Sequence, residues 1–406
     1  MSRSWPERPY HRAWLDSEGD RLLTFAEPSA AAPVGFAWLD DEGRPQPGQP
    51  ILTWITARMT HVFSLAHIRG RPGSAPLADH GLAALHGTLR DPEDGGWYSS
   101  VGHEGEPQAT AKSAYEHAFV VLAAASATAA ERPGAPELLD EALAIVEEHF
   151  WRADEGRCLE SWDRSWTKPE PYRGANSNMH FVEAFLAAAD VTGEEVWRER
   201  AMSIAERLIE GAARENRWRL PEHFDEKWRP LLEYNSEAKA DQFRPYGSTV
   251  GHWLEWSRLL LHLEASTASP PTWLMEAART LFAAAADHGW AADGTEGFVY
   301  TLDWEDRPLV RARMHWVVAE GIGAAAAFRR RTGERLYEDW YRRLWDHAER
   351  RFIDLRLGSW HHELGPDNLP AATVWSGKPD VYHAYQATLL PQLPLAPSLA
   401  VALRDE

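Results

Sequence analysis

Three histidines lie near the starts of segments with helical apolar spacing, at intervals that could bring them together. His180 occurs in NSNMHFVEA, His252 in GHWLEWSRL and His383 in VYHAYQATL, each within an amphipathic pattern. Helix starts normally favour Ser, Asp or Glu, which cap the backbone or complement the helix dipole. Capping therefore does not explain these histidines, and we expect them to serve a binding or catalytic site.

In the other helical segments, further polar or aromatic side chains lie at a similar distance from the start of the segment. One such residue recurs every 57 to 72 positions along the chain: Arg58, Tyr115, His180, His252, Trp316 and His383. Side chains at one depth converge if six inner helices run parallel around a ring. We therefore predict that these six line one cavity, together with Glu255 and Glu320, which lie about one helical turn after His252 and Trp316.

About twelve helical segments must position these side chains. Apolar residues recur with helical spacing near 9–25, 51–70, 75–90, 109–130, 136–152, 177–192, 195–213, 247–265, 272–288, 312–331, 336–353 and 382–391. Short turns join them in pairs, and in the repeated motif T-G-E-x-x-aromatic Gly193 and Gly333 suit a left-handed helix C-cap. About six αα-hairpins predict an all-α fold, an (α/α)6 barrel that forms a single domain over residues 1–406.

Longer loops separate the αα-hairpins and differ from them in composition. Residues 156–171, 215–230 and 297–314 alternate aromatic and polar side chains around Gly, Pro or Asp, a pattern typical of short β-hairpins or ordered lids. Because these loops fall between αα-hairpins, we expect them together at one end of the barrel. Loops of this length inside a compact domain are usually functional.

Composition excludes several classes of function. The formal charge of -19 argues against nucleic-acid binding, which needs a basic face, and no lysine-rich stripe suits an anionic membrane surface. The single cysteine, Cys158, cannot form an internal disulfide and fits a reducing compartment. Because no secretory signal or membrane span is visible, we expect a cytoplasmic protein without a nucleic-acid or membrane partner, which could form a homo-oligomer.

Four motifs resemble the N-acylglucosamine 2-epimerase superfamily: GANSNMHFVEAFLAAADVTGE, FRPYGSTVGHWLEWSRLLL, RMHWVVAEG and KPDVYHAYQA. The resemblance runs from Trp54 to Gln386 and is closest to the aldose–ketose isomerase branch, which contains mannose isomerases and the sulfoquinovose isomerase. It implies an (α/α)6 barrel, in agreement with the hairpin count. It also implies an enzyme that interconverts a free monosaccharide aldose and its ketose without a cofactor or metal. D-Mannose and D-fructose are the first choice, with D-lyxose and D-xylulose as a second pair.

Carried over residue by residue, the resemblance implies two groups of site residues. His252 and His383 would be the paired acid–base catalysts, with Glu255 fixing the tautomer of His252. The implied substrate-binding residues are Trp54, Arg58, Tyr115, Asn176, His180, Arg244, Trp316 and Glu320. Imidazole, with an unperturbed pKa of about 6.5, suits proton transfer near neutrality. We expect His383 to shuttle a proton from C2 to C1 through a cis-enediol while His252 helps to open the ring and Arg58 stabilises the developing charge.

Other functions use some of the same residues. His180-x-x-Glu183 and His252-x-x-Glu255 place imidazole and carboxylate on one helical face, as in di-metal bundles, although the order is reversed. An inverting glycoside hydrolase needs two carboxyls about 6.5–9.5 Å apart; the candidates are Glu222, Asp225, Glu255 and Glu320. A sugar 2-epimerase, a sulfoquinovose isomerase and a non-catalytic sugar-binding protein are the remaining alternatives.

Overall fold

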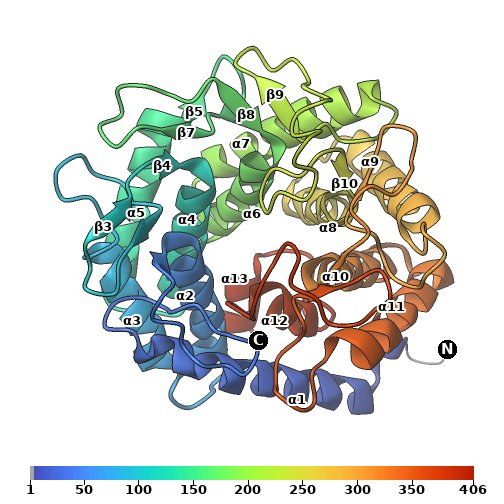
Figure 1. Ribbon diagram of the computed structural model, residues 1–406, viewed down its shortest axis with the longest axis horizontal. Coiled ribbons are helices and arrows are strands. Elements are labelled where there is room, and N and C mark those ends of the chain that lie inside the picture. The colour runs from blue at the N-terminus through green and yellow to red at the C-terminus, as the bar shows by residue number, and fades with distance from the viewer. Residues whose placement is uncertain (1–3) are drawn as a thin grey trace.

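The helices of the protein form two concentric rings, as a computed structural model that describes residues 4–406 shows (Figure 1). The inner ring consists of α2 (Thr53–Ile68), α4 (Ala114–Ala129), α6 (Ala175–Thr192), α8 (Val250–Ser266), α10 (His315–Thr332) and α12 (Tyr382–Leu389). The outer ring consists of α3 (Ser74–His86), α5 (Ala135–Ile145), α7 (Glu195–Ala205), α9 (Trp273–Ala284), α11 (Arg335–His347) and α1 (Pro9–Ala26). This is the predicted (α/α)6 barrel.

Burial separates the two rings. The inner helix α4 is buried along nearly its whole length, because it contacts the lumen on one side and the outer ring on the other. The outer helix α11 buries one stripe at helical spacing, which includes Tyr337, Tyr341 and Leu344, and exposes the opposite face. A thirteenth helix in the described residues, α13 (Leu399–Arg404), was not predicted and packs against α2, α4 and α6.

Four outer helices end in a widened π-helical turn, at Val146–Phe150, Glu206–Ala213, Ala285–Gly289 and Ala348–Phe352. These turns explain why the apolar periodicity of the outer segments runs several residues past the α-helices themselves. Between α6 and α7, and between α10 and α11, the predicted C-cap glycines adopt the left-handed conformation, with φ of 74° at Gly193 and 72° at Gly333. The two T-G-E turns are therefore confirmed.

Short strands lie in the loops around one end of the inner ring. They are β1 (Ile51–Leu52), β2 (Ser100–Val101), β3 (Pro107–Ala109), β4 (Lys112–Ser113), β5 (Trp151–Arg152), β6 (Arg157–Cys158), β7 (Ser161–Trp162), β8 (Tyr172–Gly174), β9 (His223–Asp225), β10 (Ser248–Thr249), β11 (Thr301–Leu302), β12 (Arg313–Met314) and β13 (Glu363–Leu364). The strand before an inner helix pairs antiparallel with a strand of the next long loop, as in β1–β2, β4–β7, β8–β9, β10–β11 and β12–β13. This pairing fixes the rotation of the inner helices and so the direction of their first side chains.

The long loops also carry a turn that recurs six times. A residue in the left-handed region precedes a proline by two or three positions at Gly43, Gly105, Trp166, Trp228, Asp306 and Asn368. The prolines bridge back across the turn in pairs such as Trp162–Pro169, Phe224–Pro230 and Leu302–Pro308. The predicted β-hairpins of the three aromatic loops are therefore present. In the described part of the chain, no helix is both long and apolar enough to cross a membrane.

Candidate active site

A cavity opens at the strand-bearing end of the inner ring and holds about 640 Å³ of empty space, its open mouth included. Nine of the eleven predicted site residues line it: Trp54, Arg58, Tyr115, Asn176, His180, His252, Glu255, Trp316 and His383. Most lie in the first two turns of an inner helix, immediately after the strand that orients it. Arg244 and Glu320 are not among the lining residues.

His252 is held by a carboxylate from the preceding loop. Its Nδ1 lies 2.9 Å from Oε2 of Glu222, which is 4% exposed, and the backbone N–H of Thr249 donates to Oε1 of the same group. An ionised carboxylate only accepts, so Nδ1 carries a proton, and in the neutral imidazole Nε2 is the lone-pair nitrogen. The expected partner, Glu255, is wrong for this role, although it lies one turn from His252 on the same helix.

His383 is held in the same way by Glu320. Its Nδ1 lies 3.0 Å from Oε1 of Glu320, whose Oε2 accepts from Nε of Arg258 at 2.8 Å. Burial and the nearby charge of Arg58 hold the pKa of His383 well below its usual range. The neutral form of the His383 imidazole is therefore favoured. Glu320, predicted to bind substrate, instead lies behind this imidazole.

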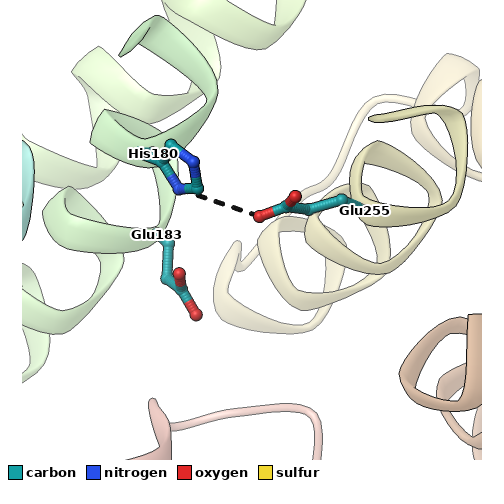
Figure 2. A group of neighbouring side chains, drawn as sticks. All are labelled: His180, Glu183 and Glu255. Atoms are coloured by element: carbon teal, nitrogen blue, oxygen red, sulfur yellow. Dashed lines mark ion pairs between the residues drawn. The ribbon is translucent and has the colours of Figure 1, made fainter. Parts of the chain in front are cut away.

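His180, Glu183 and Glu255 form a compact group (Figure 2), of which His180 and Glu255 line the cavity. Nδ1 of His180 lies 3.8 Å from Oε1 of Glu255, and within residues 4–406 neither atom has a hydrogen-bond partner. Burial and the charge of Glu320 raise the pKa of Glu255 well above its usual range, while burial and Arg58 lower that of His180. Burial thus favours the uncharged form of both groups.

The same group has the donor types of a metal site, with ligand atoms within 4.8 Å of one another. However, Arg258 lies 3.7 Å from Glu183 and 3.9 Å from Glu255, and the Tyr382 hydroxyl donates to Glu183. A divalent cation here would therefore meet a fixed positive charge.

Arg58 is immobilised at the wall of the cavity. Its Nη2 donates to the Tyr115 hydroxyl at 2.9 Å and its Nη1 to Oδ2 of Asp380 at 3.3 Å. The guanidinium also lies 4.3 Å from the ring centre of Phe119 and 4.9 Å from that of Trp54. Burial raises the pKa of Tyr115 to about 12, so its phenol remains a neutral partner. A donor fixed in this way costs no reorganisation when a substrate oxygen becomes negative.

Aromatic side chains form the rest of the wall. The Trp316 ring lies between the two carboxylate-bound imidazoles, 5.3 Å from His252 and 5.9 Å from His383 between ring centres. At the mouth, Phe243 and Trp375 meet edge to face at 5.4 Å. Flat apolar faces beside hydrogen-bonding groups suit a sugar ring, whose C–H faces are apolar and whose edges are polar.

The comparisons with known proteins agree with this geometry. The family model of N-acylglucosamine 2-epimerase (GlcNAc 2-epimerase) matches residues 35–387. The chain belongs to this family. It is 59% identical over 400 residues, 98% of each chain, to the D-mannose isomerase of Thermobifida fusca, and 53% identical over 404 residues, 98% of this chain and 97% of the other, to that of Pseudomonas cannabina pv. alisalensis. A crystal structure of D-mannose isomerase matches with a TM-score of 0.88 at 25% identity, covering 97% of this chain and 99% of the other.

Within this member of the N-acylglucosamine 2-epimerase family, Arg244 lies outside the cavity. Both of its terminal nitrogens donate to the carboxylate of Glu170, at 2.8 and 3.0 Å, and its guanidinium stacks 4.0 Å from the ring centre of Tyr172. This arginine supports the rim. Arg244 lies close to His252 in the sequence, but its side chain points toward a neighbouring loop. Nothing in the sequence indicated this direction.

Sequence reasoning missed several lining residues, all of them outside the regular pattern of one residue per helix. They are Gln242, Phe243, Pro245, Tyr300, His315, His362, Trp375, Pro379 and Asp380. Most lie in loops, where no periodicity predicts direction. His315 directly precedes Trp316, and the adjacent pair in RMHWVV is the one signal that could have drawn attention to it.

Proposed function

We propose that the protein is an aldose–ketose isomerase that interconverts D-mannose and D-fructose, with His252 and His383 as its acid–base pair. One observation carries the proposal: two imidazoles from different inner helices face one sugar-sized cavity, and a buried carboxylate binds Nδ1 of each. In its neutral form each ring therefore presents the lone pair of Nε2 to the same ligand. The similarity to proteins named D-mannose isomerase supports this choice among the activities that such a site allows.

The reaction moves one proton between adjacent carbons and needs no redox partner. His383 takes the proton from C2 of the open-chain aldose and returns it to C1, and the intermediate between these steps is a cis-enediol. The C2 electron pair shifts toward the carbonyl carbon, so negative charge develops on O1, where the Arg58 guanidinium is the fixed donor. His252 transfers protons between the sugar oxygens, first in ring opening and then between O1 and O2. Each carboxylate stabilises the imidazolium that forms transiently next to it.

The alternatives fit the contacts less well. An inverting hydrolase needs two available carboxyls, but Glu222 and Glu320 are bound to imidazoles and Asp225 pairs with Arg229 outside the cavity. A sulfonated sugar needs an additional cation, and Arg244 is already paired with Glu170. The guanidinium of Arg258 beside the acidic group supports metal-independent catalysis. A 2-epimerase would require the enediol to be reprotonated from its other face.

Free aldoses assayed for ketose formation, with and without EDTA, test the proposal. D-Mannose should give D-fructose at the same rate with the chelator, and D-lyxose, which lacks only the C6 hydroxymethyl group, should react more slowly. In D2O, deuterium should enter C2 of mannose with the wild-type enzyme but not with His383→Ala. Exchange at the wild-type rate in His383→Ala would remove His383 from the mechanism. Absence of any ketose from the wild-type enzyme would refute the activity itself.

A further inference from the structure

Two histidines outside the acid–base pair form a stacked unit in the cavity wall. The rings of His315 and His362 lie 3.8 Å apart between centres at an interplanar angle of 21°. They are 5% and 6% exposed, and both line the cavity. His315 opens α10 and His362 directly precedes β13, so the unit lies where the rims of two successive repeats meet.

Backbone carbonyls fix the tautomers of both rings. Nδ1 of His315 lies 3.3 Å from the carbonyl oxygen of His362, and Nε2 of His362 lies 3.1 Å from that of Asp380. A carbonyl oxygen only accepts, so these two nitrogens carry the protons. The remaining nitrogens, Nε2 of His315 and Nδ1 of His362, are then lone-pair acceptors. Burial lowers the pKa of His315 to about 4, and burial together with His315 holds that of His362 well below its usual range. Both acceptors therefore stay unprotonated.

Nε2 of His315 is buried, yet it has no hydrogen-bond partner in the part of the chain that the structure describes. Leaving such an acceptor unsatisfied costs stability that an apolar ring in the same place would not. A ligand hydroxyl in the cavity would remove this cost. The arrangement thus has the properties of a recognition site and lacks those of ordinary core packing.

We propose that Nε2 of His315, held by the stacked His362, accepts a hydrogen bond from a sugar hydroxyl that does not take part in proton transfer. The inference rests on the proposed isomerase function and extends it by naming a residue that selects the substrate. The His315 ring centre lies 6.2 Å from that of His383, so a hexose that reaches the base also reaches this acceptor. A hydroxyl of an uncharged polyol can donate to this nitrogen. A sulfonate or phosphate group would instead place its negative charge beside two lone-pair nitrogens, Nε2 of His315 and Nδ1 of His362. The substrate class is therefore a neutral aldose.

Substitution of His315 separates recognition from catalysis. His315→Phe keeps a planar ring but removes the acceptor, and we expect KM for D-mannose to rise on the order of 10-fold with kcat changed less than about threefold, because the lost contact is the same in ground and transition states. His315→Gln places an amide oxygen near the former Nε2 and should recover most of the affinity. His347→Phe is the matched control: His347 is 1% exposed in the outer ring and packs on Trp290, so it should leave KM unchanged.

Deoxy sugars identify the hydroxyl. The wild-type enzyme should lose affinity for one member of a panel of 3-, 4- and 6-deoxymannose, and His315→Phe should bind that sugar as well as it binds mannose. An unchanged KM in His315→Phe, or equal losses for all deoxy sugars in both enzymes, would overturn the proposal. Dissociation constants for D-mannitol are measured by calorimetry on folded variants. They test the hydrogen-bond acceptor separately from the isomerase activity. If the wild-type enzyme forms no ketose, the isomerase function fails, but a 10-fold weaker mannitol affinity in His315→Phe would still support the acceptor.

Discussion

Replacement of Glu320 by Gln tests how the protein sets the protonation state of its proposed base. Glu320 has two acceptor oxygens, one for His383 at 3.0 Å and one for Arg258 at 2.8 Å. Glutamine offers one oxygen and one NH2 group. Because Arg258 is a buried, permanently charged donor, it should take the oxygen. The NH2 group then faces Nδ1 of His383, which can only accept from it, and the proton moves to Nε2. His383 would present a donor where the reaction needs a base.

The size of the expected decrease in kcat follows from the loss of the negative charge of Glu320. A carboxylate and an imidazolium about 4 Å apart attract each other by about 4 kcal/mol at an effective dielectric constant of about 20. This attraction helps only when His383 is protonated, that is, after it has taken the C2 proton. Glu320→Gln should therefore lower kcat by roughly 100- to 1,000-fold, since each 1.4 kcal/mol is a factor of about ten. KM should change much less, because the group does not line the cavity.

Initial rates of fructose formation and deuterium exchange at C2 of mannose should fall together in Glu320→Gln. Glu264→Gln is the control, because Glu264 on the inner helix α8 also pairs with an arginine, Arg331 of α10, but neither residue lines the cavity. This variant should keep its rate within twofold. A near-ultraviolet circular dichroism spectrum checks that the core around Arg258 remains ordered. If a folded Glu320→Gln enzyme retains kcat within threefold of wild type, the carboxylate does not control His383 and the reasoning is refuted.

Two further predictions concern stability and packing. Burial raises the pKa of Glu160 to about 7, so the folded state favours its neutral form and wild-type stability should fall by about 3 kcal/mol as the pH rises from 4.5 through 7. Urea unfolding at pH 5 and pH 8 should show this fall in wild type and not in Glu160→Gln; equal pH dependence in both would contradict it. A Cβ at Gly251 would lie 2.2 Å from Cζ3 of Trp316. Gly251→Ala should therefore lower kcat/KM roughly 10- to 100-fold. Gly211→Ala, whose nearest neighbour is 3.6 Å away, should not, and equal effects of the two would disprove the role of Trp316.

The fold was predictable because it rests on repetition. Apolar periodicity marks each helix, and the 57- to 72-residue intervals in the series from Arg58 to His383 reflect one αα-hairpin per step. Parallel inner helices bring equal depths together, so the helix positions of this series could be predicted to line one cavity. The extent of the outer helices was less predictable, since their π-helical turns preserve an apolar pattern beyond the regular α-helix.

The carboxylates that bind the two imidazoles could not be predicted from the repetition of the helices. A residue three positions after His252 lies about 60° around the helix axis, so Glu255 points toward α6 and His180 while His252 turns toward the loop that carries Glu222. That loop is irregular, and its direction depends on the pairing of β8 with β9. The tautomers of His315 and His362 depend on carbonyl groups, which have no signature in the sequence.

The site also depends on the seam where the ring closes. Arg58 belongs to the first inner helix, and its partner Tyr382 begins the last, with its other partner, Asp380, in the loop just before that helix. The outer helix α1 covers this seam by packing on α12, and Arg21 on α1 donates to the backbone of the loop that follows α11. Separation of α12 from α2 would remove the counter-charge of Arg58 and displace His383, which lies on the same short helix. A ring that opened at its seam would therefore lose the proposed base and the orientation of the proposed oxyanion donor in one step, so the proposed mechanism requires the complete toroid.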